Sequence, residues 1–391
     1  ATASASFNAF ASADAGAVAV LASLTISAPY AVYAYAYCAA PTFGASLVSA
    51  DINKAIAQVT GYYDGSVLLY YNAEVGLRGG VNGGNGTLHI SSGDVNISAS
   101  GSTGTEAIIF GSSITVDLVS VSSSTATATM HIAQRANISG TQLVMDNGGS
   151  VELHSNIGTS DVPVLANSRV GSSSGASISL VGADKNKAYA YSRVFNEASI
   201  TGGSIATTGA VKVYANTNSK ANAESVGAFS VGLATIGNLY AEAVSCDYTV
   251  AYISGAEIHA SSVIIDAKGN TICRTYSGVP GSVSFVDDNK AQGVAAIGSS
   301  DGSEQNTVKA YVGNNASITT SGKVSISAYN AGDVQMMLKK TVNVNAVHLS
   351  DASLKSYAYL VTDAGVYAGA TVSTSNETAA TEIYAHDYLH E

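Results

Sequence analysis

The sequence predicts an all-β protein that folds as a β-solenoid, a coil of stacked strands with almost no helix. Val, Ile and Leu alternate with small or polar residues over short segments, which is the pattern of a strand with one buried face. These segments return after brief Gly, Ser or Asn turns, which indicates stacked copies of one unit. Charged residues make up only 12% of the 391 residues, and a disordered Gly/Ser chain would lack the recurring Val, Ile and Leu, so we expect extensive backbone pairing.

The short unit consists of one apolar residue, about four small or polar residues, and then Val, Ile or Leu at alternate positions. Its copies occupy residues 90–99, 109–118, 138–145, 258–267 and 318–328. In each copy the alternating apolar residues are predicted to form the buried face.

A longer repeat runs through the second half of the chain. Residues 251–258 are echoed at 310–318, roughly 60 residues further on, and more loosely at 197–200 and 366–372. Coils of roughly 20 residues would place three coils in each long repeat and make the chain a rod on the order of 90 Å long.

The pattern divides the chain into three segments. Residues 1–80 form an irregular, Ala- and Tyr-rich region that we expect to be rich in strands. Residues 81–182 are predicted to form a solenoid with short coils, and residues 183–391 a solenoid with long repeats of about 60 residues.

The long repeats resemble those of very large bacterial filamentous adhesins, the filamentous-haemagglutinin and leukotoxin-type filamentous adhesin group. The resemblance rests on residues 310–328, on their partner at 251–267 and on the Gly/Ala/Val-rich strands before each, and it covers roughly residues 185–375. It implies an elongated right-handed parallel β-helix, secretion, and display at the bacterial cell surface or in the extracellular matrix. It implies no catalytic residue. The N-terminal third departs from the pattern and lacks the family's secretion domain, so the export route stays open.

From this resemblance we expect a structural or adhesive protein: a segment of a secreted surface adhesin or a subunit of an extracellular filament, and not an enzyme. One alternative is a polysaccharide-acting β-helix enzyme, for which the nearest candidates are Asp287 and Asp288 with Lys290 and Arg274. Adjacency in sequence does not establish the separation that paired carboxylates need, and an exposed polar turn is the simpler interpretation.

A second alternative is a passenger segment of a secreted toxin, which rests on the absence of charge from Ala15 to Ala50. Residues 34–37 in this stretch alternate as in a strand, so we expect no membrane insertion.

Tyrosine is unusually frequent, with 22 residues. Where tyrosines fall at alternate positions, their rings lie on one strand face, and rings on successive coils would stack into a ladder. Such a ladder could contact carbohydrate or pack against a second fibre, while filling of the coil surface by aromatic rings remains open. The candidate residues are Tyr33, Tyr35, Tyr37, Tyr189, Tyr191, Tyr357 and Tyr359.

No catalytic residue, metal site or cofactor site is predicted. His386 and His390 are four apart and would need a helix to reach one metal. Cys38, Cys246 and Cys273 have no zinc spacing, and we expect small buried thiols, with pairing of Cys246 and Cys273 left open.

The partners expected are other copies of the chain, and host or cell-surface carbohydrate or protein. The net charge of −11 is dispersed without a basic cluster, so nucleic acid is not expected. The chain starts without Met and without a signal peptide, so it is interpreted as a mature or excised segment. Neither terminal region carries an obvious capping helix, so the end coils are expected to expose strand edges and to self-associate end to end or side by side.

Overall fold

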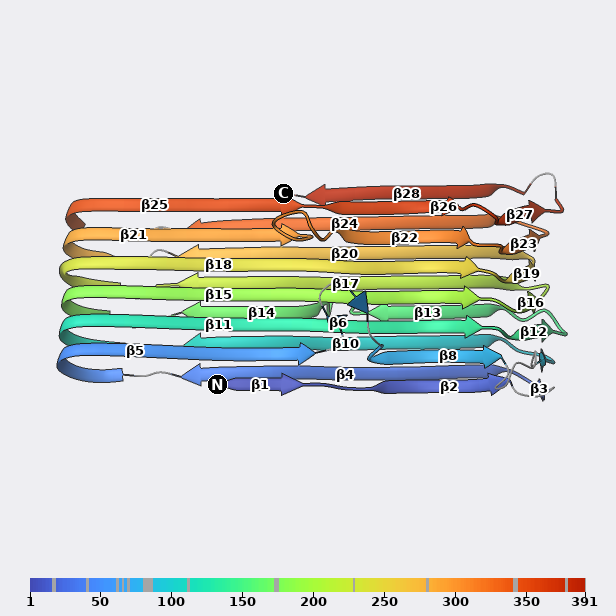
Figure 1. Ribbon diagram of the computed structural model, residues 1–391, viewed down its shortest axis with the longest axis horizontal. Helices are drawn as coiled ribbons and strands as arrows, with labels where there is room; N and C mark the ends of the chain where they lie inside the picture. Colours follow the sequence, from blue (N-terminus) through green and yellow to red (C-terminus); the bar gives the residue numbers. More distant parts are fainter. Residues whose placement is uncertain are drawn as a thin grey trace.

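The computed structural model is a parallel β-solenoid whose strands stack into three sheets (Figure 1). It describes residues 1–15, 19–39, 42–60, 63–64, 67–68, 71–79, 87–110, 113–171, 176–227, 229–278, 281–339, 344–376 and 379–390. Every regular element within these ranges is a β-strand, which confirms the predicted all-β solenoid. No helix in this described part is long and apolar enough to span a membrane.

The first sheet, sheet A, carries the longest strands. Its strands are β1 (Thr2–Ala5), β2 (Ala9–Ala15), β5 (Thr42–Thr60), β8 (Ala73–Gly79), β11 (Ser113–Ser139), β15 (Ala176–Thr201), β18 (Phe229–Ser254), β21 (Ser282–Ile297), β22 (Asn306–Gly313), β25 (Val344–Ala358) and β26 (Leu360–Val366).

Sheet B is narrow, and sheet C runs back beneath sheet A. Sheet B contains β3 (Ala19–Leu21), β9 (Thr87–Ile90), β12 (Gln142–Met145), β16 (Ser204–Ala206), β19 (Glu257–Ala260), β23 (Ser317–Thr320) and β27 (Thr371–Thr374). Sheet C contains β4 (Leu24–Ala39), β10 (Val95–Phe110), β13 (Val151–Ile157), β14 (Val164–Gly171), β17 (Ala210–Val226), β20 (Ser262–Gly278), β24 (Val324–Lys339) and β28 (Thr381–His390). Strands β6 (Tyr63–Asp64) and β7 (Val67–Leu68) form a separate antiparallel pair.

One coil consists of one passage through sheets A, B and C, for example β15, β16 and β17. The two long echoes lie directly on one another, because Ala251 pairs with Ala310 and Ile258 with Ile318. The predicted three coils per long repeat would have placed them three coils apart. The expected coil length was wrong: consecutive coils are roughly 50 to 70 residues long, so one long repeat is one coil.

The predicted shape changes accordingly. Seven coils stack to a height of about 30 Å, and strands of up to 27 residues reach about 90 Å, so the long axis lies along the strands and not along the stack. The division at residues 80 and 182 stays a prediction, although strands from all three segments share the same sheets.

The short sequence unit proves to be a corner of the coil. In residues 138–145 the chain turns from sheet A to sheet B, and in 90–99 it turns from sheet B to sheet C. The sheet A to B corner needs a left-handed backbone conformation, which Gly140, Gly202 and Gly255 supply with φ of 61°, 68° and 63°.

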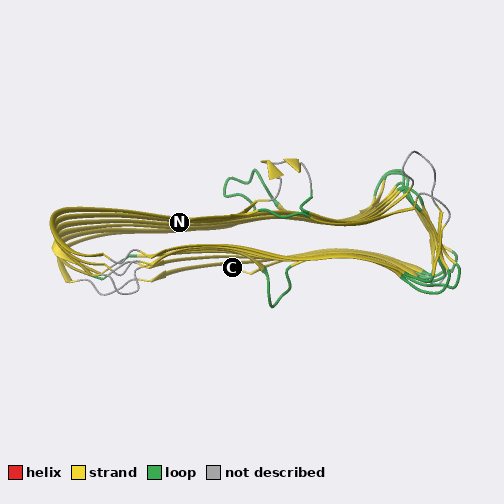
Figure 2. Cartoon of the chain, turned by 90° about the horizontal axis from the view of Figure 1, so that it is seen from below, coloured by secondary structure: helices red, strands yellow, loops and turns green. Residues whose placement is uncertain are grey.

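Columns of alanine flatten the middle of each coil, where sheets A and C lie close together (Figure 2). Ala57, Ala128, Ala190, Ala243 and Ala295 pair in register along sheet A, and all are fully buried. They pack in one cluster with a sheet C column that includes Ala166 and Ala221. Because alanine extends only one carbon from the backbone, facing alanine columns hold the two layers at a short separation.

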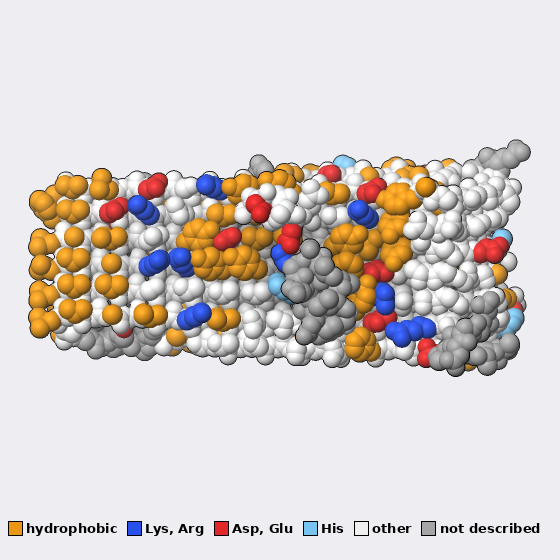
Figure 3. Space-filling view, in the orientation of Figure 1, with side chains coloured by type: hydrophobic (Ala, Val, Ile, Leu, Met, Phe, Trp, Pro, Cys, Tyr) orange, Lys and Arg blue, Asp and Glu red, His pale blue; other side chains and the backbone are white. Residues whose placement is uncertain are grey.

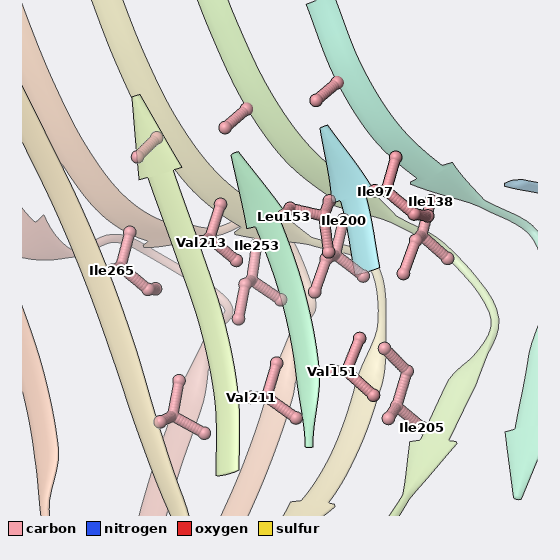
Figure 4. Packing of buried hydrophobic residues seen from close by; sticks show 14 of the residues in the cluster. Ile97, Ile138, Val151, Leu153, Ile200, Ile205, Val211, Val213, Ile253 and Ile265 are labelled. Carbon is pink, nitrogen blue, oxygen red and sulfur yellow. The ribbon is translucent and has the colours of Figure 1, made fainter. Parts of the chain in front are cut away.

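Larger residues fill the end that sheet B closes. Ile138, Ile200 and Ile253 stack along sheet A, and they pack against Leu153 and Val213 of sheet C (Figure 4). These branched side chains separate the two layers and leave room for a third wall, so the cross-section widens where Ile, Val and Leu replace Ala.

A buried polar ladder crosses the interior between these two apolar regions. The Asn196 side chain donates to the backbone oxygens of Ser155 and Asn216, at 3.0 and 2.9 Å, and it accepts from the Ser155 hydroxyl. Further along the stack, the Asp247 carboxylate accepts hydrogen bonds from Ser219, from Thr271 at 2.9 Å and from Ser245 at 3.3 Å. Burial raises the pKa of Asp247 to about 6, against the hydrogen bonds, which lower it.

At the end of the coil opposite sheet B, polar side chains are buried and apolar side chains are exposed, which reverses the usual distribution. Asp117 is buried and accepts from the backbone and hydroxyl of Ser46 and from the hydroxyl of Ser49, at 2.9, 2.8 and 2.6 Å. Its neighbours Val116 and Leu118, predicted to be buried, are 50% and 47% exposed. The alternation was therefore predicted correctly, but the buried face was wrong, because the polar side chains bond to one another inside.

We name the exposed apolar residues at this end the apolar edge; they form regular columns in Figure 3. The apolar edge consists of Leu47, Val48, Val116, Leu118, Val121, Ile178, Leu180, Val181, Leu233, Ile236, Val283, Phe285, Val344, Val347 and Leu349.

We predict that Ala128→Leu destabilises the fold, because three extra carbons must enter the flattened middle of the coil. Overpacking of this kind typically costs about 1 to 3 kcal/mol. Chemical denaturation followed by circular dichroism measures the change. Thr127→Leu, one residue away and half-buried, is the control, and equal stability of the two variants would show that the alanine columns do not limit the layer separation.

We predict that Asp247→Asn raises the stability of the protein relative to wild type more above pH 6 than at pH 4. The folded pKa of about 6 lies above the unfolded value of 3.8, so the protonated form favours folding, and this stability is lost as pH rises through that window. The wild-type protein loses about 3 kcal/mol of folding free energy across this window. The variant has no carboxylate at this position, so it does not show this loss. Denaturation midpoints across pH check this, with Asp288→Asn as control; parallel pH profiles for wild type and Asp247→Asn would contradict it.

Candidate binding surface

The outer face of sheet A carries stacked aromatic side chains with charged side chains beside them. Outward positions alternate along each strand, and the coils stack in register, so side chains from three coils become neighbours. In the space-filling view, two groups of hydrophobic side chains lie on this face with charged residues beside them (Figure 3).

The first aromatic group is built by β15 and β18. The rings of Tyr189 and Tyr191 lie 6.2 Å apart and nearly parallel, as expected for alternate positions on one face. Tyr240 of the next coil lies 5.6 Å from Tyr189 and donates a hydrogen bond to Glu242 at 2.9 Å. Burial, followed by the charge of Glu242, raises the pKa of the Tyr191 hydroxyl, so the phenol stays protonated.

A second aromatic group forms true coil-to-coil ladders. Tyr252, Tyr311 and Tyr367 stack with centroid distances of 5.0 and 4.8 Å, and Phe195 stacks on Tyr248 at 4.9 Å. None of these five residues was among the predicted tyrosines, because ladder membership depends on register between coils. The rings face one another, so they strengthen the stacking and present mainly their edges to solvent.

Glu197 lies beside these ladders and is 5% exposed. It accepts hydrogen bonds from the hydroxyls of Tyr71 and Tyr252, the second at 2.8 Å. The Arg135 guanidinium lies 4.3 Å above the Tyr71 ring. The Glu197 carboxylate is therefore held by two phenols, while the Arg135 guanidinium pairs with Glu74 at 2.6 Å.

A pocket of about 490 Å³ lies beside the first aromatic group. Register places His131, Arg193 and Cys246 side by side on three successive coils at this point. Glu304, from the turn after β21, bonds to Arg193 at 2.5 Å and closes one side. Tyr191 and Glu242 line the opposite side.

The electrostatics of this pocket favour binding over nucleophilic chemistry. Burial, followed by the negative charge of Glu304, raises the pKa of the Cys246 thiol, so the thiolate is disfavoured. Burial and the neighbouring Arg193 lower the pKa of His131 to about 4, so the imidazole is neutral at pH 7. Arg193 lies between the histidine and the cysteine in this column, so the two do not form an activated pair.

The other predicted tyrosines are divided between sheets, because Tyr357 falls in the register column of Tyr191 on sheet A whereas three others lie on sheet C. Tyr33, Tyr35 and Tyr37 project from β4 on sheet C, with exposed fractions of 61%, 54% and 47%, so they belong to a different face from Tyr189 and Tyr191. Tyr357 lies in β25 and pairs with Ala296, while Tyr359 follows that strand. The seven residues do not form one surface.

The candidate enzyme residues do not come together. Asp287 is fully buried and accepts from Thr235 at 2.5 Å and from Asn289 at 2.9 Å, whereas Asp288 points to the outer face of the same strand. Arg274 lies on sheet C beside Asp333. The predicted exposed turn was also wrong, since Asp287 and Asp288 lie within β21.

The structure also places the candidate histidines and the three cysteines. His386 and His390 lie in strand β28, so the helix that would join them at one metal does not form. The described residues contain no cluster of three or more metal-ligating side chains. Cys38, Cys246 and Cys273 are all free thiols, with Cys273 buried. No known protein family, curated protein or solved structure matches the chain.

We predict that iodoacetamide labels Cys246 at pH 8 at least about tenfold more slowly than it labels free glutathione, because the raised pKa leaves little thiolate. Peptide mapping by mass spectrometry identifies the labelled thiol. Glu304→Gln removes the nearest negative charge and should accelerate labelling, whereas the distant Glu257→Gln should not. Rapid labelling of Cys246 in the wild-type protein would contradict this account.

Proposed function

We propose that this chain is a structural and adhesive extracellular β-solenoid, a segment of a secreted bacterial surface adhesin or a subunit of an extracellular filament. Support comes from coils of one repeated design, in which the backbone is paired throughout and the outward side chains are free to vary. The resemblance of residues 251–267 and 310–328 to filamentous-adhesin repeats supports the same proposal, including right-handed winding and display at the cell surface.

The adhesive part of the proposal rests on one observation, the pocket between Tyr191, Glu242 and the Arg193–Glu304 pair. Its volume of about 490 Å³ lies in the range of small-ligand sites. Phenol and serine hydroxyls, three carboxylates and a guanidinium offer donors and acceptors that match the hydroxyls of a sugar. The neighbouring rings add apolar contact for its carbon face.

The charge of the pocket selects among sugars. Glu242, Glu304 and Asp301 face a single cation, Arg193, and His131 is neutral at pH 7. The chain as a whole carries a net charge of −11. Acidic polysaccharides are therefore repelled, and neutral oligosaccharides at a cell surface are the favoured ligand class.

The two ends of the stack support assembly. In the described pairings, β1 bonds only to β5 at one end and β25 only to β21 at the other, so each end coil has an edge without a strand partner. An edge of this kind can pair with another copy. End-to-end association would extend the same parallel ladder.

We predict that Tyr191→Ala and Glu242→Gln each weaken binding of a neutral oligosaccharide by about tenfold or more, because stacking and hydrogen bonds are lost. Isothermal titration calorimetry with cellohexaose and chitohexaose measures this, and hyaluronan serves as the acidic comparison. Tyr384→Ala, 55% exposed on sheet C, is the matched control. The pocket assignment fails if hyaluronan binds best or if the control loses as much affinity as the pocket variants.

A further inference from the structure

The apolar edge reverses the normal distribution of polarity in a soluble fold. Interior positions at this end hold hydrogen-bonded groups such as Asp117 and Asp287, while Leu180 and Leu233 are 50% and 56% exposed. The hydrogen bonds of both carboxylates show that the polar groups are well accommodated inside. The exposed apolar residues are thus a property of the fold, and contiguous apolar surface of this kind marks a contact site.

The edge is laid out in columns that run along the stack. One column passes through Val116, Ile178 and Val283, and the half-buried Val231 completes it between the last two, in consecutive coils. Beside it lies the column of Leu118, Leu180 and Leu233, which occupy equivalent positions between paired residues of their strands. Each column repeats at the spacing of the coils, about 4.8 Å.

Between these two columns lies a groove of about 440 Å³. Its walls are apolar side chains, and small residues such as Ser179 and Gly232 line it between the walls. A Cβ atom at Gly232 would lie 2.1 Å from the Ser179 carbonyl oxygen, so the backbone there has no room for a side chain. The surface therefore offers a ridge of leucines next to a groove of matching length.

We infer that the apolar edge is a lateral interface that binds the same edge of a second copy of this chain. A second copy provides the same 4.8 Å periodicity, so the leucine ridge of each partner can enter the groove of the other over all coils, as in tightly interdigitated sheets. This arrangement is isologous and closes as a pair. This inference rests on the proposed function and deepens it, because it names the surface through which copies associate side by side.

The dimensions of the apolar edge and the charges beside it fit a second copy of this chain. Six stacked positions and about six residues of strand give a footprint of about 500 Å² per copy, or about 1,000 Å² in total, which reaches the lower limit for a specific interface. Charged residues such as Lys185 and Lys290 begin just beyond the apolar columns, on the side toward the middle of sheet A. An apolar centre with a charged rim is the usual anatomy of a protein interface.

The test is sedimentation velocity and light scattering of the 391-residue chain over a wide range of concentration. We expect a reversible dimer, which Leu180→Lys or Leu233→Lys weakens at least about tenfold, because two like charges would meet in an apolar contact. Val162→Lys, at a position 54% exposed outside the edge, should leave dimerisation unchanged. All three sites are at the surface, so circular dichroism should show equal folding.

Three outcomes would overturn the inference. These are a chain that stays monomeric at every concentration, a dimer that tolerates both leucine substitutions, and a monomer that binds phosphatidylcholine vesicles through the leucines. Loss of the dimer with oligosaccharide binding and end-to-end fibres intact would reject only the lateral interface. Loss of oligosaccharide binding and of fibres, with the dimer intact, would reject the proposed function and leave the interface standing.

Discussion

The hydrogen-bonded pairing of each coil with the coils above and below is the constraint on which everything else in this molecule depends. Strand β11 is 27 residues long and keeps one register with β15 from Ile114 to Ser139, so its side chains are fixed in columns. A residue type that repeats in one column then acts on the whole stack. The alanine column through Ala128 and the isoleucine column through Ile200 set the layer separation at two places in the same strands.

The fold class and the equivalence of the long repeats could be predicted because both follow from local pattern. Period-two alternation identifies a strand, and the likeness of residues 251–258 to 310–318 identifies equivalent positions in two copies of the repeat. Only the pairing shows that these copies lie in adjacent coils. The coil length could not be read in this way. Sheets A and C contribute similar alternating segments, so a corner such as 90–99 resembles a whole short repeat until pairing shows which segments lie one above another.

The candidate pocket was hidden for the same reason. His131, Arg193 and Cys246 are far apart in sequence and meet only because two registers place them in one column. The alternation of Tyr189 with Tyr191 correctly indicated a shared strand face, yet it carried no information on which sheet or which neighbours that face would have. A motif search finds groups at fixed spacing, whereas this site depends on coil lengths that vary from turn to turn.

The apolar edge exposes a more basic ambiguity of period-two patterns. Alternation divides a strand into two faces without stating which is buried, and the usual rule assigns the apolar face to the interior. Around Val116 that rule fails, because Asp117 finds Ser46 and Ser49 within reach inside the narrow end, where little apolar volume is available. Hydrogen bonds replace the missing core there, and the apolar face is left to solvent or to another protein. The cost of that exposure is most simply offset by a surface of equal period, which each copy of the chain itself carries.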